Sequence, residues 1–255
     1  MIFYIELTDK RNTYIMKNLK SLGYMVKEFN FKSMDILDTE KAVFVFSPAR
    51  KLLVSEIFVL PSTSKVYGGE QTAEILAQLE QKNISYKNLL NSEVLTVQNA
   101  MLTAEGVLAL LIQNTDKSIY DLHTLILGGG RVGKAIAVLF SRLGIDVAIA
   151  NRSENNYAAA YLFCKNAIRL DKLQEKIADY DVIINTIPEQ ILSDDILKNL
   201  ADDTLIMEVA SVPCLNTANL SGYKFKFLSA PALPGKFSPD TAGKIITEEI
   251  LKDFT

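Results

Sequence analysis

The sequence has very little of what metal centres and disulfide frameworks need. Histidine occurs once in 255 residues, as His123, which excludes a histidine-rich metal site, and we expect no bound metal. Cysteine occurs twice, as Cys164 and Cys214, without the C-x-x-C spacing of a redox or zinc motif. Two such cysteines indicate a reducing compartment rather than a disulfide-stapled fold.

An excess of positive charge and long apolar runs are also missing. The formal net charge is −3 and the isoelectric point is about 5.4, whereas non-specific nucleic-acid binding needs a basic face. The first residues lack the basic and apolar regions of a signal peptide, and no apolar run approaches the roughly 18 residues of a membrane span. We therefore expect a cytoplasmic protein that binds neither nucleic acid nor membrane.

What the sequence does have is a glycine cluster between a strand-like run and a helical pattern. Residues 124–127 form the run, and Gly128, Gly130 and Gly133 follow with the spacing G-x-G-x-x-G. In dinucleotide-binding folds the first glycine permits the turn, the second lets the pyrophosphate approach, and the third packs the helix on its strand. The N–H groups that begin the helix then face the phosphates. A second strand-like run, residues 147–150, completes a strand–helix–strand unit, which predicts a dinucleotide site; a merely structural glycine turn is the alternative.

The residues after the second strand favour one dinucleotide over the other. An NAD site usually carries Asp or Glu there, whereas this chain has Asn151, Arg152 and Ser153, with no carboxylate until Glu154. A guanidinium can pair in a bidentate manner with the 2′-phosphate of NADP, and Asn and Ser can add hydrogen bonds. We therefore predict NADP; the alternative is that Arg152 is a solvated loop charge.

Strand and helix patterns alternate along the chain, which indicates parallel sheets with right-handed crossovers. We predict an α/β protein with a Rossmann-type doubly wound sheet over residues 120–229 and a smaller, flavodoxin-like α/β domain over residues 1–93. Residues 94–119 are predicted to form an interdomain helix, buried because residues 107–112 are apolar on every side and too short to cross a membrane. Residues 230–255 are predicted to form a loop and a helix that pack back across the junction onto the N-terminal domain.

In the N-terminal domain the pattern predicts strands that end in polar loops, with one helix capped by Asp9 and another from Thr72. The predicted strands cover residues 2–7, 24–29, 42–46 and 57–60. The loops after the last two carry Arg50, Ser62 and Thr63. Because ligands of open parallel sheets bind beyond the carboxyl ends of strands, these loops are candidate substrate contacts, with ordinary turns as the alternative.

In the Rossmann domain the pattern predicts further strands that end in loops of small residues and proline, beside which a flat nicotinamide ring can lie. The strands cover residues 182–185, 205–209 and 225–228, and helices are predicted over residues 156–165 and 173–178. The final helix begins well, because Ser238 is a good N-cap and Pro239 fits the first helical position. The residues we assign to cofactor binding are Gly128, Gly130, Arg131, Val132, Gly133, Asn151, Arg152, Ser153, Thr186, Ile187, Pro188, Ala210 and Ser211.

Several stretches together resemble the A subunit of dipicolinate synthase, a sporulation enzyme of spore-forming bacteria. They are N-A-M-L-T-A-E-G (99–106), I-Q-N-T-D-K-S-I (112–119), L-G-G-G-R-V-G (127–133), I-N-T-I-P (184–188), L-I-M-E-V-A-S-V-P (205–213) and A-P-A-L-P-G-K-F-S-P-D-T-A-G (230–243). The resemblance implies oxidation of a dihydrodipicolinate-type ring to dipicolinate, with NADP+ accepting hydride. It also implies a partner, a flavoprotein-like B subunit, and we expect a homo-oligomer.

The chain departs from this family in two places. Cys214 and Leu215 stand where the family usually has a glycine pair, and the glycine-rich first turn of the N-terminal domain is replaced by residues 7–10. The resemblance covers residues 94–251 well and the first 90 residues only loosely. Substrate contacts from the N-terminal domain are therefore not carried over from the family.

A substrate with two carboxylates needs cations and hydroxyl or amide donors. The candidates are Arg50, Ser62, Thr63, Asn99, Thr103, Lys236 and Thr241, of which Thr103, Lys236 and Thr241 are our first choices as catalytic residues. For Thr103 the alternative is a helix cap, with Glu105 as a first-turn acid. His123 precedes the first strand of the dinucleotide domain, so we do not expect it to be a general base.

Two other functions are consistent with the same residues. One is another NADP-linked oxidoreductase resembling shikimate dehydrogenase, whose sites also place N-R-S/T after the second strand; the Lys–Asp pair of such enzymes is not identifiable here. The other is a non-catalytic NADP-binding subunit that senses the cofactor or scaffolds a partner, which the altered loop at residues 211–216 and the short N-terminal domain favour.

Overall fold

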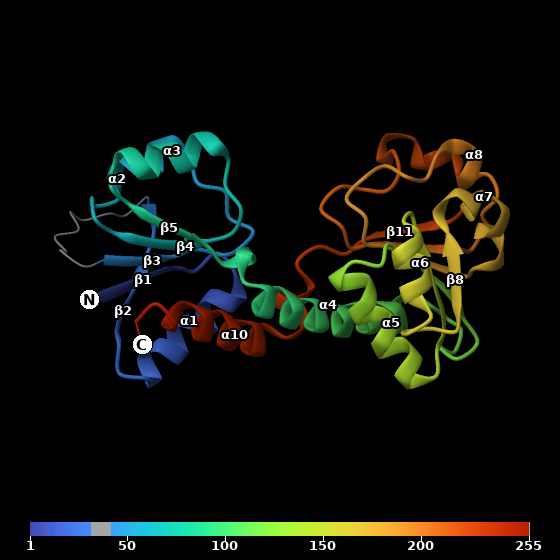
Figure 1. The fold of residues 1–255 in the computed structure, drawn as a ribbon, viewed down its shortest axis with the longest axis horizontal. Helices are drawn as coiled ribbons and strands as arrows, with labels where there is room; N and C mark the ends of the chain where they lie inside the picture. Colours follow the sequence, from blue (N-terminus) through green and yellow to red (C-terminus); the bar gives the residue numbers. More distant parts are fainter. Residues whose placement is uncertain (32–41, 255) are drawn as a thin grey trace. The chain divides into compact units, whose positions relative to one another are not determined.

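The structure is a computed structural model of the chain and describes residues 1–31 and 42–254. The chain divides into two compact units, Met1–Asn99 with Pro234–Thr255, and Ala100–Leu233 (Figure 1). Each unit contains a parallel sheet, of five strands in the first and six in the second, with helices packed on it. The predicted α/β class with two parallel sheets is therefore confirmed.

The first unit has the flavodoxin-like strand order 2-1-3-4-5. Its elements are β1 (Ile2–Glu6), α1 (Lys10–Ser21), β2 (Met25–Phe29), β3 (Ala42–Val45), α2 (Val54–Val59), β4 (Lys65–Gly68), α3 (Ala73–Gln81), β5 (Ser85–Asn88), α9 (Leu233–Phe237, which begins at the boundary between the units) and α10 (Pro239–Leu251). The predicted cap at Asp9 is confirmed, because its side chain accepts from the backbone of α1. Thr72, predicted as the start of a helix, is the residue that caps α3.

Successive residues of its strands face opposite layers of helix, as the period of a strand requires. Phe3 and Ile5 of β1 pack against α1 and α10, whereas Tyr4 between them packs on the face that α2 and α3 cover. Helix α10 lies close along α1 (Figure 1), and a Cβ atom at Gly243 would lie 2.7 Å from the Cβ atom of Tyr14. The C-terminal helix thus completes the core of the N-terminal unit.

The strand predicted at residues 57–60 is wrong, because residues 57–59 end helix α2 and Leu60 is its C-cap. Ile57 and Leu60 are buried while Phe58 is 68% exposed, which is the single apolar face of a helix. The carboxylate of Glu56 accepts from the backbone N–H of Leu53 at 2.9 Å and so caps the first turn. The true strand, β4, follows the polar residues 61–64 instead of preceding them.

This correction removes Ser62 and Thr63 from the substrate side of the sheet. Both precede β4 and therefore lie at the amino edge of the parallel sheet, opposite the edge at which ligands bind. The argument that made them candidate substrate contacts is wrong.

The second unit has the Rossmann strand order, with the first strand, β6, beside the fourth, β9. Its elements are β6 (His123–Leu127), α5 (Arg131–Leu143), β7 (Asp146–Asn151), α6 (Glu154–Ala160), β8 (Asn166–Arg169), α7 (Leu173–Lys176), β9 (Val182–Asn185), α8 (Asp194–Leu197), β10 (Leu205–Glu208) and β11 (Lys226–Ser229). The predicted strands are confirmed to within two residues, whereas the helix predicted over residues 156–165 ends at Ala160.

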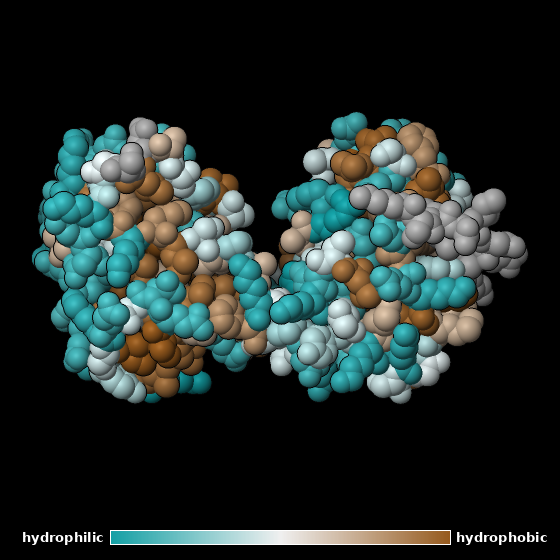
Figure 2. All heavy atoms as spheres, turned by 180° about the vertical axis from the view of Figure 1, so that it is seen from behind, coloured by the Kyte–Doolittle hydropathy of each residue, from teal (hydrophilic) through white to brown (hydrophobic). Residues whose placement is uncertain are grey.

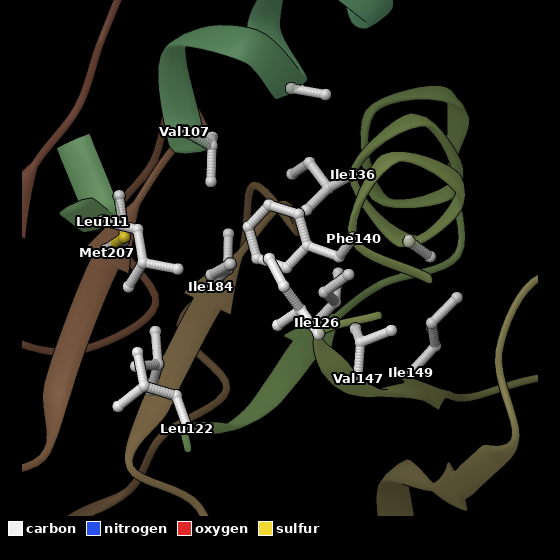
Figure 3. Packing of buried hydrophobic residues seen from close by; sticks show 14 of the residues in the cluster. Val107, Leu111, Leu122, Ile126, Ile136, Phe140, Val147, Ile149, Ile184 and Met207 are labelled. Carbon is white, nitrogen blue, oxygen red and sulfur yellow. The ribbon is translucent and has the colours of Figure 1, made fainter. Parts of the chain in front are cut away.

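Both faces of this sheet are covered, which is why its strands are apolar throughout. On one face Phe140 of α5 lies at the centre of a cluster with Ile136, Ile126 and Ile184, and Val107 joins from the preceding long helix (Figure 3). On the other face the alternate strand residues pack on α7, α8 and the segment around residues 214–215. The sheet therefore holds the ends of its strands in fixed positions.

Helix α4 (Glu93–Asn114) begins one residue before the predicted interdomain helix of residues 94–119 and ends five residues earlier than predicted, and the boundary between the two units falls within it. It has 22 residues and a mean hydropathy of 1.5 over its most apolar 18, so by length and composition it is able to cross a membrane. The prediction that its apolar stretch is too short for that is wrong. This is weak support for a membrane segment, because a core helix of a soluble protein meets the same criteria.

The burial of α4 differs from the prediction as well. Val107 and Leu111 are fully buried, but Ile112 is 55% exposed, so the helix is not buried on every side. Thr103 lies in the middle of the helix and is therefore not its cap, so that alternative is wrong.

The segment predicted as a loop of small residues, 229–235, contains the start of a short helix, α9. Pro234 is tolerated there because a proline in the first turn needs no helical hydrogen-bond partner. The next helix, α10, begins at Pro239 after Ser238, as predicted.

Apolar side chains are also found on the surface, where brown patches interrupt the polar surface of both units (Figure 2). Leu162 and Phe58 are the most exposed of them, at 81% and 68%. Exposed apolar residues are normal on folded proteins and do not by themselves mark a binding surface.

Candidate dinucleotide-binding site

The glycines of the turn between β6 and α5 differ in what surrounds them. Gly128 has a φ of +98°, and a Cβ atom there would lie 2.7 Å from the side chain of Ile187. A Cβ atom at Gly133 would lie 1.9 Å from the carbonyl oxygen of Gly128. At Gly130, by contrast, no atom of the described residues would lie within 4 Å of a Cβ atom. The first and third glycines are thus required by the turn itself, whereas the second leaves open space where the helix begins.

That open space lies at the positive end of a helix. Gly130 is the N-cap of α5, and its carbonyl accepts the first helical hydrogen bond, from Lys134. The N–H groups of a first helical turn have no partners within the helix, and they favour an anion. Arg131 is exposed at the first helical position, and Val132 packs partly against the core. The geometry fits the pyrophosphate of a dinucleotide.

The loop after β9 braces the glycine turn from the neighbouring strand. The hydroxyl of Thr186 donates to the carbonyl of Leu127 at 2.8 Å, and the Thr186 backbone N–H donates to the same carbonyl at 3.0 Å. Ile187 lies against Gly128, while Pro188 is exposed. Thr186 and Ile187 therefore hold the turn in shape beside the predicted ligand.

The three polar residues after β7 have different environments. Asn151 is buried, and its side-chain amide donates to the carbonyl of Asn156 at 3.0 Å. Ser153 caps α6 by accepting from the Asn156 backbone at 3.2 Å. Arg152 is exposed and donates to the carboxylate of Glu189 at 2.8 Å. An exposed pair of this kind contributes little, so a 2′-phosphate is able to replace Glu189 at small cost.

Residues 111–222 match the family described as "D-isomer specific 2-hydroxyacid dehydrogenase, NAD binding domain". The A subunit of dipicolinate synthase from Bacillus subtilis (strain 168) is 32% identical over 203 residues, which are 75% of this chain and 65% of that protein. The chain is a relative of the dipicolinate synthase A subunit. It spans just under two thirds of that relative's length.

Two further proteins are similar to the chain. The crystal structure of the dipicolinate synthase A subunit from Bacillus halodurans superposes with a TM-score of 0.86 at 23% identity, over 98% of this chain and 96% of that one. Shikimate dehydrogenase (NADP(+)) of Staphylococcus haemolyticus (strain JCSC1435) is 27% identical over 233 residues, 84% of this chain and 80% of that protein. Together the comparisons support an oxidoreductase that uses a nicotinamide dinucleotide.

A buried carboxylate, that of Glu208, holds the loop after β10, which contains Cys214. Oε1 of Glu208 accepts from the side-chain amide of Asn185 at 2.8 Å and from the backbone of Ala210 at 2.9 Å. Oε2 accepts from the backbone of Cys214 at 2.7 Å. Burial and the neighbouring Glu208 raise the pKa of the Cys214 thiol, which is therefore protonated at neutral pH. Ser211, in the same loop, is exposed.

Glu208 and Asn185 were not among the predicted site residues, although the sequence carries a signal for them. Each is a polar residue that ends an otherwise apolar strand, and the register pairs them directly across β9 and β10. Polar residues at the carboxyl ends of adjacent parallel strands meet at one edge, which is the ligand edge of such sheets.

His123 lies far from this edge. It is the first residue of β6, so roughly 13 Å of strand separates it from the glycine turn. It is exposed, and its Nδ1 atom lies 2.6 Å from a carboxylate oxygen of Asp146 at the same amino edge. The expectation that His123 is no general base at the dinucleotide site agrees with this position.

The predicted substrate residues are distributed over both units. Thr103 is a buried residue of α4 in the second unit. Lys236 of α9 and Thr241, in the first turn of α10, are exposed residues of the first unit. Asn99 is half-buried, at the end of the first unit's part of α4.

Arg50 is already paired in the first unit. It lines a cavity of about 400 Å³ at the carboxyl ends of β1 and β2. Its Nε lies 3.2 Å from a carboxylate oxygen of Glu6, and its Nη2 pairs with Glu56. Two carboxylates therefore share one guanidinium, so Arg50 does not present an unshared positive charge to a dicarboxylate.

Proposed function

We propose that this chain is an oxidoreductase similar in activity to the A subunit of dipicolinate synthase. In this proposal it oxidises a dihydrodipicolinate-type ring to dipicolinate, and the reaction belongs to spore formation in the cytoplasm. The 32% identity to the protein from Bacillus subtilis carries the choice of reaction. The open space at Gly130, at the start of α5, supports the dinucleotide as hydride acceptor.

Each part of the reaction is assigned to residues of this chain or to the dinucleotide. A bound oxidised dinucleotide would supply the hydride acceptor, and the ring would lose one hydride and one proton in becoming aromatic. The turn at Gly128 and Gly130 and the first turn of α5 bind and orient the pyrophosphate. Thr103, Lys236 and Thr241 are the proposed substrate contacts, with Lys236 as the cation for a carboxylate.

Positioning carries most of the catalysis in this proposal. Aromatisation supplies driving force, so a strong general base is not required, and a bound water is a sufficient proton acceptor. Holding the donor carbon against the nicotinamide in attack geometry then becomes the main contribution of the protein.

We propose NADP rather than NAD as the dinucleotide. The exposed guanidinium of Arg152 supports this choice, because its partner Glu189 is itself exposed and replaceable by phosphate. Shikimate dehydrogenase (NADP(+)), to which the chain is similar over 84% of its length, also has NADP in its name.

The test is reduction of NADP+ in the presence of freshly generated dihydrodipicolinate, followed at 340 nm, with dipicolinate identified as the product. The assay is run with and without a flavoprotein-like B subunit, which we propose as the partner. We also propose a homo-oligomer, which sedimentation of the purified chain tests. Turnover that also depends on Thr103 and Lys236 is the expected result. Tight NADP+ binding without turnover in either condition contradicts the proposed reaction and favours a non-catalytic NADP-binding subunit.

A shikimate dehydrogenase-type reaction is the second candidate, favoured by the 27% identity over 84% of this chain. Assaying NADP+ reduction with shikimate in parallel separates the two. Turnover with shikimate and none with the dihydro ring selects the second candidate.

A further inference from the structure

The carboxylate of Glu208 lies buried in the second unit. Glu208 is 3% exposed, and none of the ion pairs found among residues 1–31 and 42–254 involves it. Its oxygens accept from three neutral N–H donors, on Asn185, Ala210 and Cys214. An ionised carboxylate is acceptor-only, which is the pattern seen here. A negative charge is thus held in the protein by dipoles that do not neutralise it.

The sheet topology places this charge on one side of the dinucleotide site. The half of the sheet with β6, β7 and β8 carries the glycine turn, and the half with β9, β10 and β11 lies beyond the point where the strand order reverses. A dinucleotide bound across that point leaves its second nucleotide to the second half. Leu127, Asn185 and Glu208 pair in register across β6, β9 and β10, so Glu208 is two strand spacings, roughly 10 Å, from the start of the glycine turn.

We propose that Glu208 is a fixed negative charge on the nicotinamide side of the site and makes the protein bind the oxidised coenzyme more tightly than the reduced one. This inference rests on the proposed dinucleotide-dependent function. The oxidised nicotinamide ring carries one positive charge that the reduced ring lacks, while the two coenzymes share the rest of the molecule. A buried negative charge therefore lowers the dissociation constant of the oxidised coenzyme relative to that of the reduced one. The low local dielectric strengthens its attraction for the cationic ring.

The preference suits an oxidation that aromatises its substrate. Tighter binding of the oxidised coenzyme makes the free-energy change of hydride transfer less negative, and formation of the aromatic product offsets this difference. Weaker binding of the reduced coenzyme then favours its release after turnover.

A purely structural role for Glu208 is the competing explanation. Its hydrogen bonds to Ala210 and Cys214 hold the loop after β10, so any substitution that loosens the loop lowers affinity for both coenzymes. Three variants separate the effect of the Glu208 charge from the effect of its hydrogen bonds to the loop. Glu208→Gln keeps the size and removes the charge, Glu208→Asp keeps the charge, and Cys214→Ala disturbs the loop while the carboxylate stays.

The experiment is calorimetric titration of the full chain and each variant with NADP+ and NADPH, with thermal unfolding of every sample as a control for folding. We expect NADP+ to bind the wild type more tightly than NADPH. In Glu208→Gln the ratio of the two dissociation constants should fall about tenfold, equivalent to about 1.4 kcal/mol. In Glu208→Asp and Cys214→Ala the ratio should stay within about threefold of the wild-type ratio, even where both affinities fall.

Wild-type protein that binds NADPH as tightly as NADP+, or more tightly, overturns the inference, and so does an unchanged ratio in Glu208→Gln. If Glu208→Gln does not fold, the test uses the ratio of the NADPH and NADP+ dissociation constants in the wild type and in Glu208→Asp. Tighter binding of NADP+ by both then supports the inference, and equal or tighter binding of NADPH overturns it. Binding of neither coenzyme by the wild type is a different result, because it overturns the proposed function and the inference together.

Discussion

Gly133 of α5 packs directly on the carbonyl oxygen of Gly128, so that a Cβ atom at residue 133 would lie 1.9 Å from that oxygen. Backbone is present on both sides of the contact, and no flexible side chain is able to move out of the way. We predict that Gly133→Ala displaces the start of α5 and destabilises the protein by about 1–3 kcal/mol, as overpacking typically does. Urea unfolding followed by circular dichroism measures this; an unchanged midpoint would contradict the observed packing.

Gly130→Ala is the matched substitution in the same turn. Within the part of the chain that the structure describes, no heavy atom lies within 4 Å of the added Cβ atom, and the φ of −73° is accessible to alanine. Stability should therefore fall by no more than about 1 kcal/mol, the cost of alanine in place of glycine at an N-cap. Dinucleotide affinity should fall at least about tenfold, because the methyl group occupies the space through which the pyrophosphate approaches the backbone. Wild-type affinity in a folded Gly130→Ala protein would show that the pyrophosphate binds elsewhere.

Arg152→Ala should change the choice of coenzyme and leave the fold intact. Arg152 and Glu189 are both exposed, so the loss of their pair should alter stability by no more than about 0.5 kcal/mol. The dissociation constant for NADP+ should rise about tenfold, with that for NAD+ nearly unchanged, as measured by fluorescence titration. Glu189→Gln, which frees the guanidinium, should bind NADP+ at least as tightly as the wild type. Equal effects of Arg152→Ala on both coenzymes would remove Arg152 from the 2′-phosphate site.

Asp9 should contribute to stability in a pH-dependent manner. Burial alone raises the pKa of Asp9, but the guanidinium of Arg11, 2.6 Å away, and the hydroxyl of Ser47 outweigh it, so the pKa lies below the usual 3.8. A lowered pKa in the folded state gives stability that is present above about pH 4 and is lost as the pH falls through the folded-state pKa. Unfolding midpoints between pH 2.5 and 7 should record this loss.

Asp9→Asn isolates the charge, because Asn is an equally good N-cap for α1. The variant should be about 1–2 kcal/mol less stable than the wild type at pH 7, since it leaves the buried guanidinium of Arg11 without its carboxylate. It should approach the wild type in acid, where Asp9 is protonated and the ion pair is absent from both proteins. A constant difference across the whole pH range would mean that the ion pair with Arg11 contributes nothing.

Both cysteines should be slow to react in the native protein. Burial raises the pKa of the Cys164 thiol, and burial together with Glu208 raises that of Cys214. The reactive species is the thiolate, so labelling by a chromogenic disulfide reagent at pH 7.5 should be slow in native protein and complete in denaturant. Rapid native labelling of Cys214 would show that the loop after β10 opens easily, and Cys214→Ala identifies the residue concerned.

The local sequence pattern was sufficient to predict the strands of the dinucleotide unit, but it did not predict every strand of the N-terminal unit. The strand at Val182–Asn185 has its predicted bounds, because an apolar run followed by a turn has few alternatives in a sheet covered on both faces. Residues 57–60 have an equally apolar composition, but they form the end of α2 and its C-cap. The prediction failed there because such a short run does not distinguish a buried strand from one face of a helix. In the structure, the contact between the Glu56 carboxylate and the backbone N–H of Leu53 caps the first turn of α2.

The sequence by itself determined the glycine turn and its helix, since those conformations depend on residues within one short segment. The residues that pair with charged side chains in each unit come from separate segments of the chain. Only the tertiary structure revealed that Glu6 and Glu56 share Arg50, that Arg152 meets Glu189, and that Glu208 binds Asn185 and Cys214. The physical reason is that these contacts depend on strand order and register, which the spacing of residues along a single chain does not record.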